Sequence, residues 1–372
     1  MNTATDEALP FISDDGRSLY FSSSRPEGFG GFDIWVSQRR SVNEPWAQPR
    51  NLGPSINGSG NELTPALSPD GFRLDFGSTR TGGFGAEDLY SARRHNRRND
   101  FGWRPAVNLG SGVNIDASDG GPFRFEDDQT GTTTLYFNSD RPGGSGGIDI
   151  YSGALNEDRD DDVFGPAVLT RELNSPSTDR RPVIRRDGLE MILESNRPGS
   201  VGGSSDLWVT TRATTSDVWS TPVNLGPVVN SASVESRPAF SSDGTELYFN
   251  SNRTGTVGGQ DLFVSTRTRI IVLVTGVTLE PSTVRVGGSF TATFSGNSLT
   301  DKTYFDIRFR TPGSTVEEIS NNWQQGTSGS HSVVPGTAIG AWTITGLRSH
   351  QNPDDHRGSF VAASVVFTMS PF

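Results

Sequence analysis

One sequence unit of about 57 residues occurs five times in the first 267 residues of this chain. The copies share an arginine, a glycine-rich stretch, an aspartate and a run of alternating apolar residues. They are SSRPEGFGGFDIWVSQR ending at Arg39, STRTGGFGAEDLYSARR at Arg94, SDRPGGSGGIDIYSGAL at Leu155, SNRPGSVGGSSDLWVTTR at Arg212 and SNRTGTVGGQDLFVSTR at Arg267. Self-similarity at a fixed period indicates stacked or radially repeated supersecondary units, so the repeat constrains the fold more than any single motif.

Each unit predicts four short strands. A short strand after a proline is followed by an Asp-Gly pair in four units, a strong hairpin signal because glycine accepts positive φ. The third unit has a longer EDDQTGTTT segment instead. A second strand, the glycine loop, a third strand that starts at the aspartate and an outer segment such as WSTPVNLG complete the unit. Four short strands with aromatic landmarks are typical of a propeller blade, so we expect an all-β, five-bladed β-propeller over residues 1–269.

The first unit lacks the outer segment that precedes the other units, although Asn2 and Glu7 match their Asn-to-acid spacing. Two explanations fit. Either TRIIVLVTG (268–276) supplies the outer strand of the last blade, or the chain is part of a longer, secreted precursor, which we favour.

The consensus P-x-x-S-x-D-G-x-x-L-Y-F-x-S-x-R-x-G-x-x-G-G-x-D-L-W resembles the WD40-like PD40 repeat of TolB-type β-propellers over about residues 1–267. This resemblance implies export to the bacterial periplasm or the extracellular space. It does not imply one function, because such repeats occur in scaffold proteins and in propellers fused to peptidases.

The pattern changes near Gly276. Residues 276–372 alternate apolar and polar positions with frequent turns and predict an immunoglobulin-like β-sandwich, with Trp323 and Trp342 in or against its core. This part resembles the Ig-like modules of bacterial surface proteins.

Composition excludes several functions. The net charge of -11 argues against nucleic-acid binding, and the longest apolar run is too short to span a bilayer. The absence of cysteine excludes disulfides, thiolate catalysis and Cys-zinc sites.

Two rings of charged residues are expected to converge at the channel mouth, on the face of the glycine loops, and form a tentative ligand-binding site. The arginines are Arg25, Arg80, Arg141, Arg197 and Arg253. The acids, each three residues before a proline, are Glu7, Glu62, Asp119, Asp179 and Glu235. Arginine forks bind carboxylate or sulfate, and paired carboxylates serve glycosidases. Fivefold repetition favours structural ion pairs instead, because catalysis needs groups with different roles.

Metal and cofactor signals are weak. The aspartates that end the glycine loops are expected to accept hydrogen bonds from their own loops. They are Asp33, Asp88, Asp149, Asp206 and Asp261. Calcium at these loops, or at Asp158, Asp160 and Asp162 of an acidic loop, is the weaker alternative. The histidines of HQNPDDH (350–356) fit no zinc pattern. We therefore expect no metal site and no cofactor.

These observations favour an exported, non-enzymatic binding module whose channel mouth takes a protein or carbohydrate ligand. A glycoside hydrolase or sialidase-like enzyme and a structural spacer of a surface protein are the alternatives.

Overall fold

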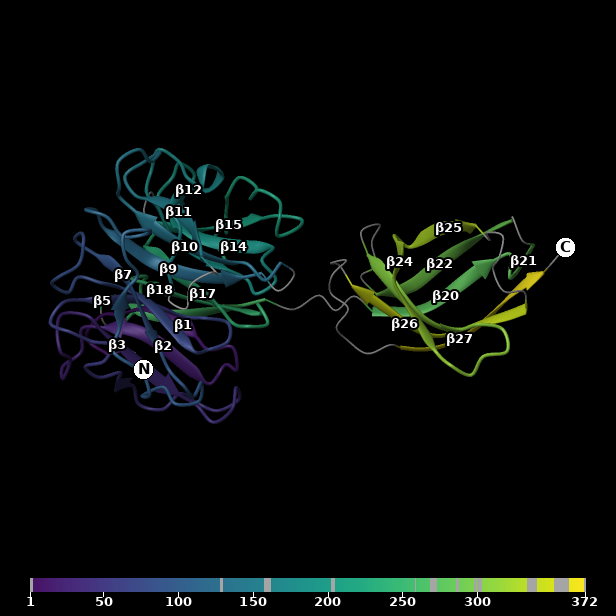
Figure 1. Cartoon of the computed structure of the whole chain (residues 1–372), viewed down its shortest axis with the longest axis horizontal. Helices are drawn as coiled ribbons and strands as arrows, with labels where there is room; N and C mark the ends of the chain where they lie inside the picture. Colours follow the sequence, from purple (N-terminus) through teal and green to yellow (C-terminus); the bar gives the residue numbers. More distant parts are fainter. Residues whose placement is uncertain are drawn as a thin grey trace. The chain divides into compact units, whose positions relative to one another are not determined.

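The computed structural model describes residues 3–127, 130–156, 162–201, 205–257, 259–267, 273–285, 288–297, 299, 303–332, 340–350 and 361–370. It divides the chain into two compact units, Met1–Arg267 and Thr268–Phe372 (Figure 1). Nearly all regular secondary structure of the described residues is β-strand, with one short 3-10 turn at Arg171–Leu173, and turns and loops connect the strands.

The first unit consists of five antiparallel sheets, each one blade. Blade one contains β1 (Glu7–Ile12), β2 (Ser18–Ser23), β3 (Asp33–Gln38) and β4 (Arg50–Asn51). Blade two contains β5 (Glu62–Leu67), β6 (Arg73–Ser78), β7 (Asp88–Arg93) and β8 (Val107–Asn108). Blade three contains β9 (Asp119–Glu126), β10 (Thr133–Ser139), β11 (Asp149–Ala154) and β12 (Val168–Leu169). Blade four contains β13 (Asp179–Ile184), β14 (Glu190–Ser195), β15 (Asp206–Thr211) and β16 (Val223–Asn224). Blade five contains β17 (Glu235–Phe240), β18 (Glu246–Ser251) and β19 (Asp261–Thr266).

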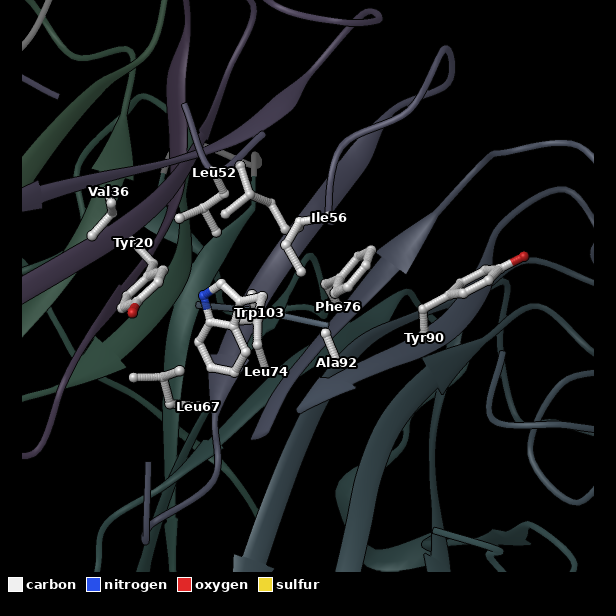
Figure 2. Packing of buried hydrophobic residues seen from close by; sticks show 11 residues of the cluster. Tyr20, Val36, Leu52, Ile56, Leu67, Leu74, Phe76, Tyr90, Ala92 and Trp103 are labelled. Atoms are coloured by element: carbon white, nitrogen blue, oxygen red, sulfur yellow. The ribbon is translucent and has the colours of Figure 1, made fainter. Parts of the chain in front are cut away.

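Separate apolar clusters join neighbouring blades. Between blades one and two, Trp103 lies among Tyr20, Leu52, Leu74 and Phe76 (Figure 2). Equivalent clusters join blades two and three, three and four, and four and five. Full burial of a side chain such as Phe76 stabilises the fold by about 1.5–3 kcal/mol.

The fifth cluster closes the ring, because Phe21 and Trp35 of blade one pack with Ala239 and Tyr248 of blade five. The Glu7 backbone N–H also donates to the Gln260 carbonyl across this junction, at 3.1 Å. The Asp-Gly turns form as expected, with positive φ at Gly16, for example. Thr268–Val272 lie outside the described residues, and Leu273 onward pairs with β22 of the second unit.

The first strand of each blade begins at the ring acid, three residues before the proline. The prediction that this strand starts after the proline is therefore wrong. The pairing of the first strand with the second shifts by one residue just before or at the proline, which is a β-bulge. The residue before the proline is left-handed in every blade. These residues are Leu9 (φ 59), Thr64 (φ 52), Gly121 (φ 62), Arg181 (φ 53) and Arg237 (φ 61). The bulge re-aims this position, and all five residues line a pocket at the centre of the ring.

The second unit is a β-sandwich of two sheets. One sheet contains β20 (Leu273–Glu280), β22 (Ser289–Asn297) and β25 (Ser328–Ser332). The other contains β21 (Thr283–Arg285), β27 (Val361–Ser370), β26 (Gly340–His350), β23 (Tyr304–Arg310) and β24 (Glu318–Gln325). Apolar residues of both sheets form one core, and Trp323 and Trp342 pack against it as expected. The prediction of a five-bladed propeller followed by an Ig-like sandwich is therefore confirmed.

Candidate active site at the channel mouth

The two predicted charged rings pair with each other, blade by blade. Each arginine donates from its NH2 group to the ring acid of its own blade. The N···O distances are 3.1 Å for Arg25–Glu7, 3.2 Å for Arg80–Glu62, 2.6 Å for Arg141–Asp119, 2.5 Å for Arg197–Asp179 and 3.0 Å for Arg253–Glu235. All five acids have no exposed surface.

Blade four shows how such a pair is held. Arg197 Nε donates to Ser195 Oγ at 3.0 Å, and its NH2 group donates to the Leu173 carbonyl at 2.6 Å. The guanidinium also lies over the Trp208 ring, 5.3 Å from its centroid. The carboxylate of Asp179 accepts from the Ser175 N–H at 2.6 Å. These contacts tie the connection between blades to the hairpin, which favours the structural interpretation of the rings. Ligand binding by the ring residues stays a prediction.

The glycine-loop aspartates accept hydrogen bonds from their own loops, as predicted. In blade five, Val257 N–H donates to Asp261 Oδ2 at 2.6 Å. Asp33, Asp88, Asp149 and Asp206 accept the corresponding bond. The loops are therefore hairpins fixed by an internal acceptor.

A second set of polar residues lies at the same end of the strands and differs from blade to blade. Four positions make up this set. Glu87 of blade two and Gln260 of blade five come directly before the loop aspartate, and Glu194 of blade four and Asn250 of blade five are next to last in the second strand. Arg180 of blade four comes one residue after the ring acid, and Arg181 of blade four and Arg237 of blade five come two residues after it. The sequence analysis missed all of them, because it followed the residues that recur rather than the aligned positions at which the five units differ.

Glu194 is fully buried between two arginines. Arg180 donates to Glu194 Oε1 from Nε at 2.8 Å and from NH2 at 2.6 Å, while Arg181 NH1 donates to Oε2 at 2.8 Å. Ser205 Oγ adds a hydrogen bond at 2.9 Å. Burial disfavours the charged carboxylate, but the adjacent Arg181 and Arg180 outweigh it and lower the pKa of Glu194 to about 2. Glu194 is thus a permanent anion that positions two guanidiniums.

Glu87 has the opposite electrostatic environment. Burial raises its pKa to about 7, although Arg181, Arg237 and Arg180 act in the opposite direction. Its carboxylate forms no hydrogen bond or ion pair with the described part of the chain. It lies over two glycines, since a Cβ at Gly77 would be 2.0 Å, and one at Gly120 2.5 Å, from Glu87 Oε1. Blades one, four and five carry side chains at both of these positions. Gly77 of blade two and Gly120 of blade three therefore leave the room that this carboxyl group occupies.

A third part of the cluster lies where blades five and one meet. Asp6 Oδ1 accepts from the Gln260 N–H at 3.0 Å, and Gln260 Oε1 accepts from Arg237 NH1 at 3.0 Å and from Asn250 Nδ2 at 2.7 Å. Burial and the neighbouring Arg181 lower the pKa of Arg237 to about 9, and the negative charges of Glu194 and Asp6 oppose this shift. The mouth therefore holds carboxyl groups with different environments together with three guanidiniums.

The remaining sequence candidates lie elsewhere. Asp158, Asp160 and most of HQNPDDH lie outside the described residues, as does Asn2. Asp162 is bound by arginines instead, with Arg73 Nε at 2.9 Å and Arg93 NH2 at 3.2 Å. Among the residues that the structure describes, no group of three or more His, Asp or Glu side chains is arranged to hold a metal ion.

Comparisons with known proteins identify the fold. No protein-family model and no curated protein matches the sequence. Among solved structures, an alpha-L-arabinofuranosidase from Lactobacillus brevis is similar at 17% identity and a TM-score of 0.50, over 71% of this chain and 91% of that one. A xylan beta-1,4-xylosidase from Bacillus halodurans C-125 is similar at 11% identity and a TM-score of 0.50, over 99% of this chain and 91% of its own. At these identities the likeness establishes the fold, the five-bladed β-propeller of glycosidases.

These neighbours contradict two predictions. The propeller is similar to glycoside hydrolases rather than to TolB-type PD40 repeat proteins, so that assignment is wrong. The prediction of a non-enzymatic module is contradicted as well, because the similar propellers are enzymes. The physical reason is that the repeat encodes turns, blade packing and ring ion pairs, all of which concern the fold. Chemistry depends on the positions at which the blades differ.

None of the helical residues described in this chain forms a segment long and apolar enough to cross a membrane.

Proposed function

We propose that this protein is a glycoside hydrolase whose active site is the channel mouth on the glycine-loop face. The observation that carries the proposal is Glu87, a carboxyl group without a hydrogen-bond partner among the described residues and with its pKa raised to about 7. Glycosidases need one carboxylic acid that is still protonated near neutral pH, and a second carboxylate that stays ionised. The glycosidase propellers of similar fold support this reading.

Glu87 would act as the general acid. It donates its proton to the glycosidic oxygen as the bond from that oxygen to the anomeric carbon breaks. Asp6 is the candidate base, since its Oδ1 is fixed by the Gln260 N–H and its other oxygen has no partner in the described part of the chain. Asp6 would take a proton from the water that attacks the anomeric carbon. Asp6 then releases this proton to solvent and Glu87 takes one up from solvent, which restores both groups.

Glu194 would act as a positioning residue. It has no exposed surface and is bound by Arg180 and Arg181, so it does not reach a substrate. Its charge holds both guanidiniums beside the mouth, where they would donate hydrogen bonds to the departing oxygen.

The test is hydrolysis of a panel of polysaccharides and 4-nitrophenyl glycosides by the full chain. We expect Glu87→Gln to lower kcat/KM about 10²–10⁴-fold, the usual contribution of general acid catalysis. The loss should be much smaller for 2,4-dinitrophenyl glycosides, whose leaving group needs no proton. The matched control is Glu44→Gln, which changes an exposed carboxylate between β3 and β4 of blade one and should leave the rate unchanged. Absence of hydrolysis across the panel, or full activity of Glu87→Gln, would refute the proposal.

A further inference from the structure

Arg237 stands out among the arginines of the channel mouth because it lacks a carboxylate partner. It forms no ion pair with the described residues, and its one hydrogen-bond acceptor is the neutral amide oxygen of Gln260, at 3.0 Å. Its Nε is buried without a hydrogen-bond partner among those residues. Arg180 and Arg181 share the carboxylate of Glu194, and each ring arginine has its own acid.

A half-buried guanidinium whose Nε is fully buried and has no ion-pair partner among the described residues is costly, because burial removes water without supplying a partner. Burial and the positive charge of Arg181 lower the pKa of Arg237 accordingly. The fold keeps this charge at a position where other blades have Leu9, Thr64 or Gly121. Arg237 also lines the central pocket, so the group that would satisfy it can arrive from solvent.

A second unsatisfied atom lies beside it. Asn250 Oδ1 is buried and has no donor among the described residues, while its Nδ2 binds Gln260 Oε1 at 2.7 Å and Ser236 Oγ at 2.9 Å. Asn250 has no exposed surface, so of the two only Arg237, which lines the pocket, can meet a ligand. Its guanidinium complements an anionic group such as an acidic sugar carries.

We propose that the substrate is a glycan bearing an anionic group, a carboxylate or a sulfate ester, and that Arg237, assisted by Arg181, binds that group. This inference rests on the proposed function, because it names the substrate class of the same site. A carboxylate or sulfate held by the two planar guanidinium forks would supply the counter-ion that the described residues lack.

Binding is measured by titration calorimetry with the full-length Glu87→Gln variant, so that hydrolysis does not interfere. The probes are hexagalacturonate and its carboxyl-reduced counterpart, and a sulfated galactan hexasaccharide and its desulfated counterpart. We expect at least tenfold tighter binding of one acidic probe than of its neutral counterpart, and that probe identifies the anion as carboxylate or sulfate. Equal affinity for acidic and neutral probes, or no binding of either acidic probe, would overturn the inference.

The role of Arg237 is tested by adding Arg237→Gln, with Arg40→Gln, an exposed arginine, as the matched control. We expect Arg237→Gln to abolish the preference for the acidic probe and leave the Tm unchanged or raised, since it removes an uncompensated charge. A preserved preference would overturn the inference. If Arg237→Gln does not fold, Arg237→Lys decides, because it keeps the charge without the fork. A loss of affinity of threefold or more supports the inference, and unchanged affinity overturns it.

The two proposals fail in different ways. Hydrolysis of neutral glycosides that depends on Glu87, without any preference for acidic probes, leaves the proposed function standing and removes this inference. Selective binding of an acidic probe without any hydrolysis supports this inference about the ligand and removes the proposed function.

Discussion

Replacing Arg197 by Met tests whether the charged ring holds the propeller together. The substitution keeps the volume of the side chain but removes its hydrogen bonds to Asp179, Ser195 and the Leu173 carbonyl. Asp179, which has no exposed surface, is then left without a cation. Breaking a buried pair from one side typically costs about 3–5 kcal/mol of unfolding free energy. Asp179 keeps its bonds to the Ser175 N–H and hydroxyl, so we expect roughly 4 kcal/mol rather than more.

The fifth blade supplies a matched comparison. The Arg253 side chain makes the same contacts but is 27% exposed, against 9% for Arg197. Water can reach the vacated site there, so we expect Arg253→Met to cost about half as much, roughly 2 kcal/mol.

The assay is urea unfolding of the full chain with pulses of hydrogen exchange, read by mass spectrometry on peptides from β14 and β15. These peptides report the propeller separately from the sandwich. Equal costs for Arg197→Met and Arg253→Met would contradict the burial argument. A cost below about 1 kcal/mol for Arg197→Met, together with lost binding of an acidic probe, would show that the ring serves ligand binding rather than stability.

Two further predictions concern Glu87. Since Glu87 acts in its protonated form, kcat/KM should fall as the pH rises through about 7, and a pH–rate profile without this limb would contradict its role as the acid. Gly77→Ala should reduce activity at least tenfold with little change in Tm, because the new Cβ displaces a flexible carboxyl group 2.0 Å away and not the backbone. The matched control is Ser22→Ala, because Ser22 in blade one is equivalent to Gly77, and this change should leave the rate unchanged. Gly110→Ala would be unsuitable, since Gly110 has a φ of 79° that alanine tolerates poorly.

The sequence predicts the blades well because repetition marks local requirements. Asp-Gly turns, loop aspartates and the arginine–acid spacing recur in nearly every copy, and each corresponds to a hydrogen-bonded feature of the structure. The left-handed residue before each proline was not predicted. Leu9 or Thr64 gives no local signal for positive φ, and the bulge arises from the pairing of two strands.

The site was missed for a related reason. Glu87 and Phe32 occupy equivalent positions, and only their comparison shows that one blade carries a carboxyl group where another has an aromatic ring. The raised pKa of Glu87 then depends on burial by residues from other strands, which no single unit encodes.

Positions at which the five blades agree stabilise the propeller, and positions at which they differ form the candidate site. Each ring arginine neutralises an acid of its own blade, so the ring adds structure without leaving a free charge at the mouth. Inside it, Arg180 and Arg181 share one carboxylate, and Arg237 has none. An excess of positive charge therefore remains beside a carboxyl group that burial keeps largely protonated below pH 7. Fivefold symmetry would not allow this arrangement, because five identical blades would balance every charge in the same way. The departures from the repeat are consequently the positions at which substrate selection and proton transfer are to be sought.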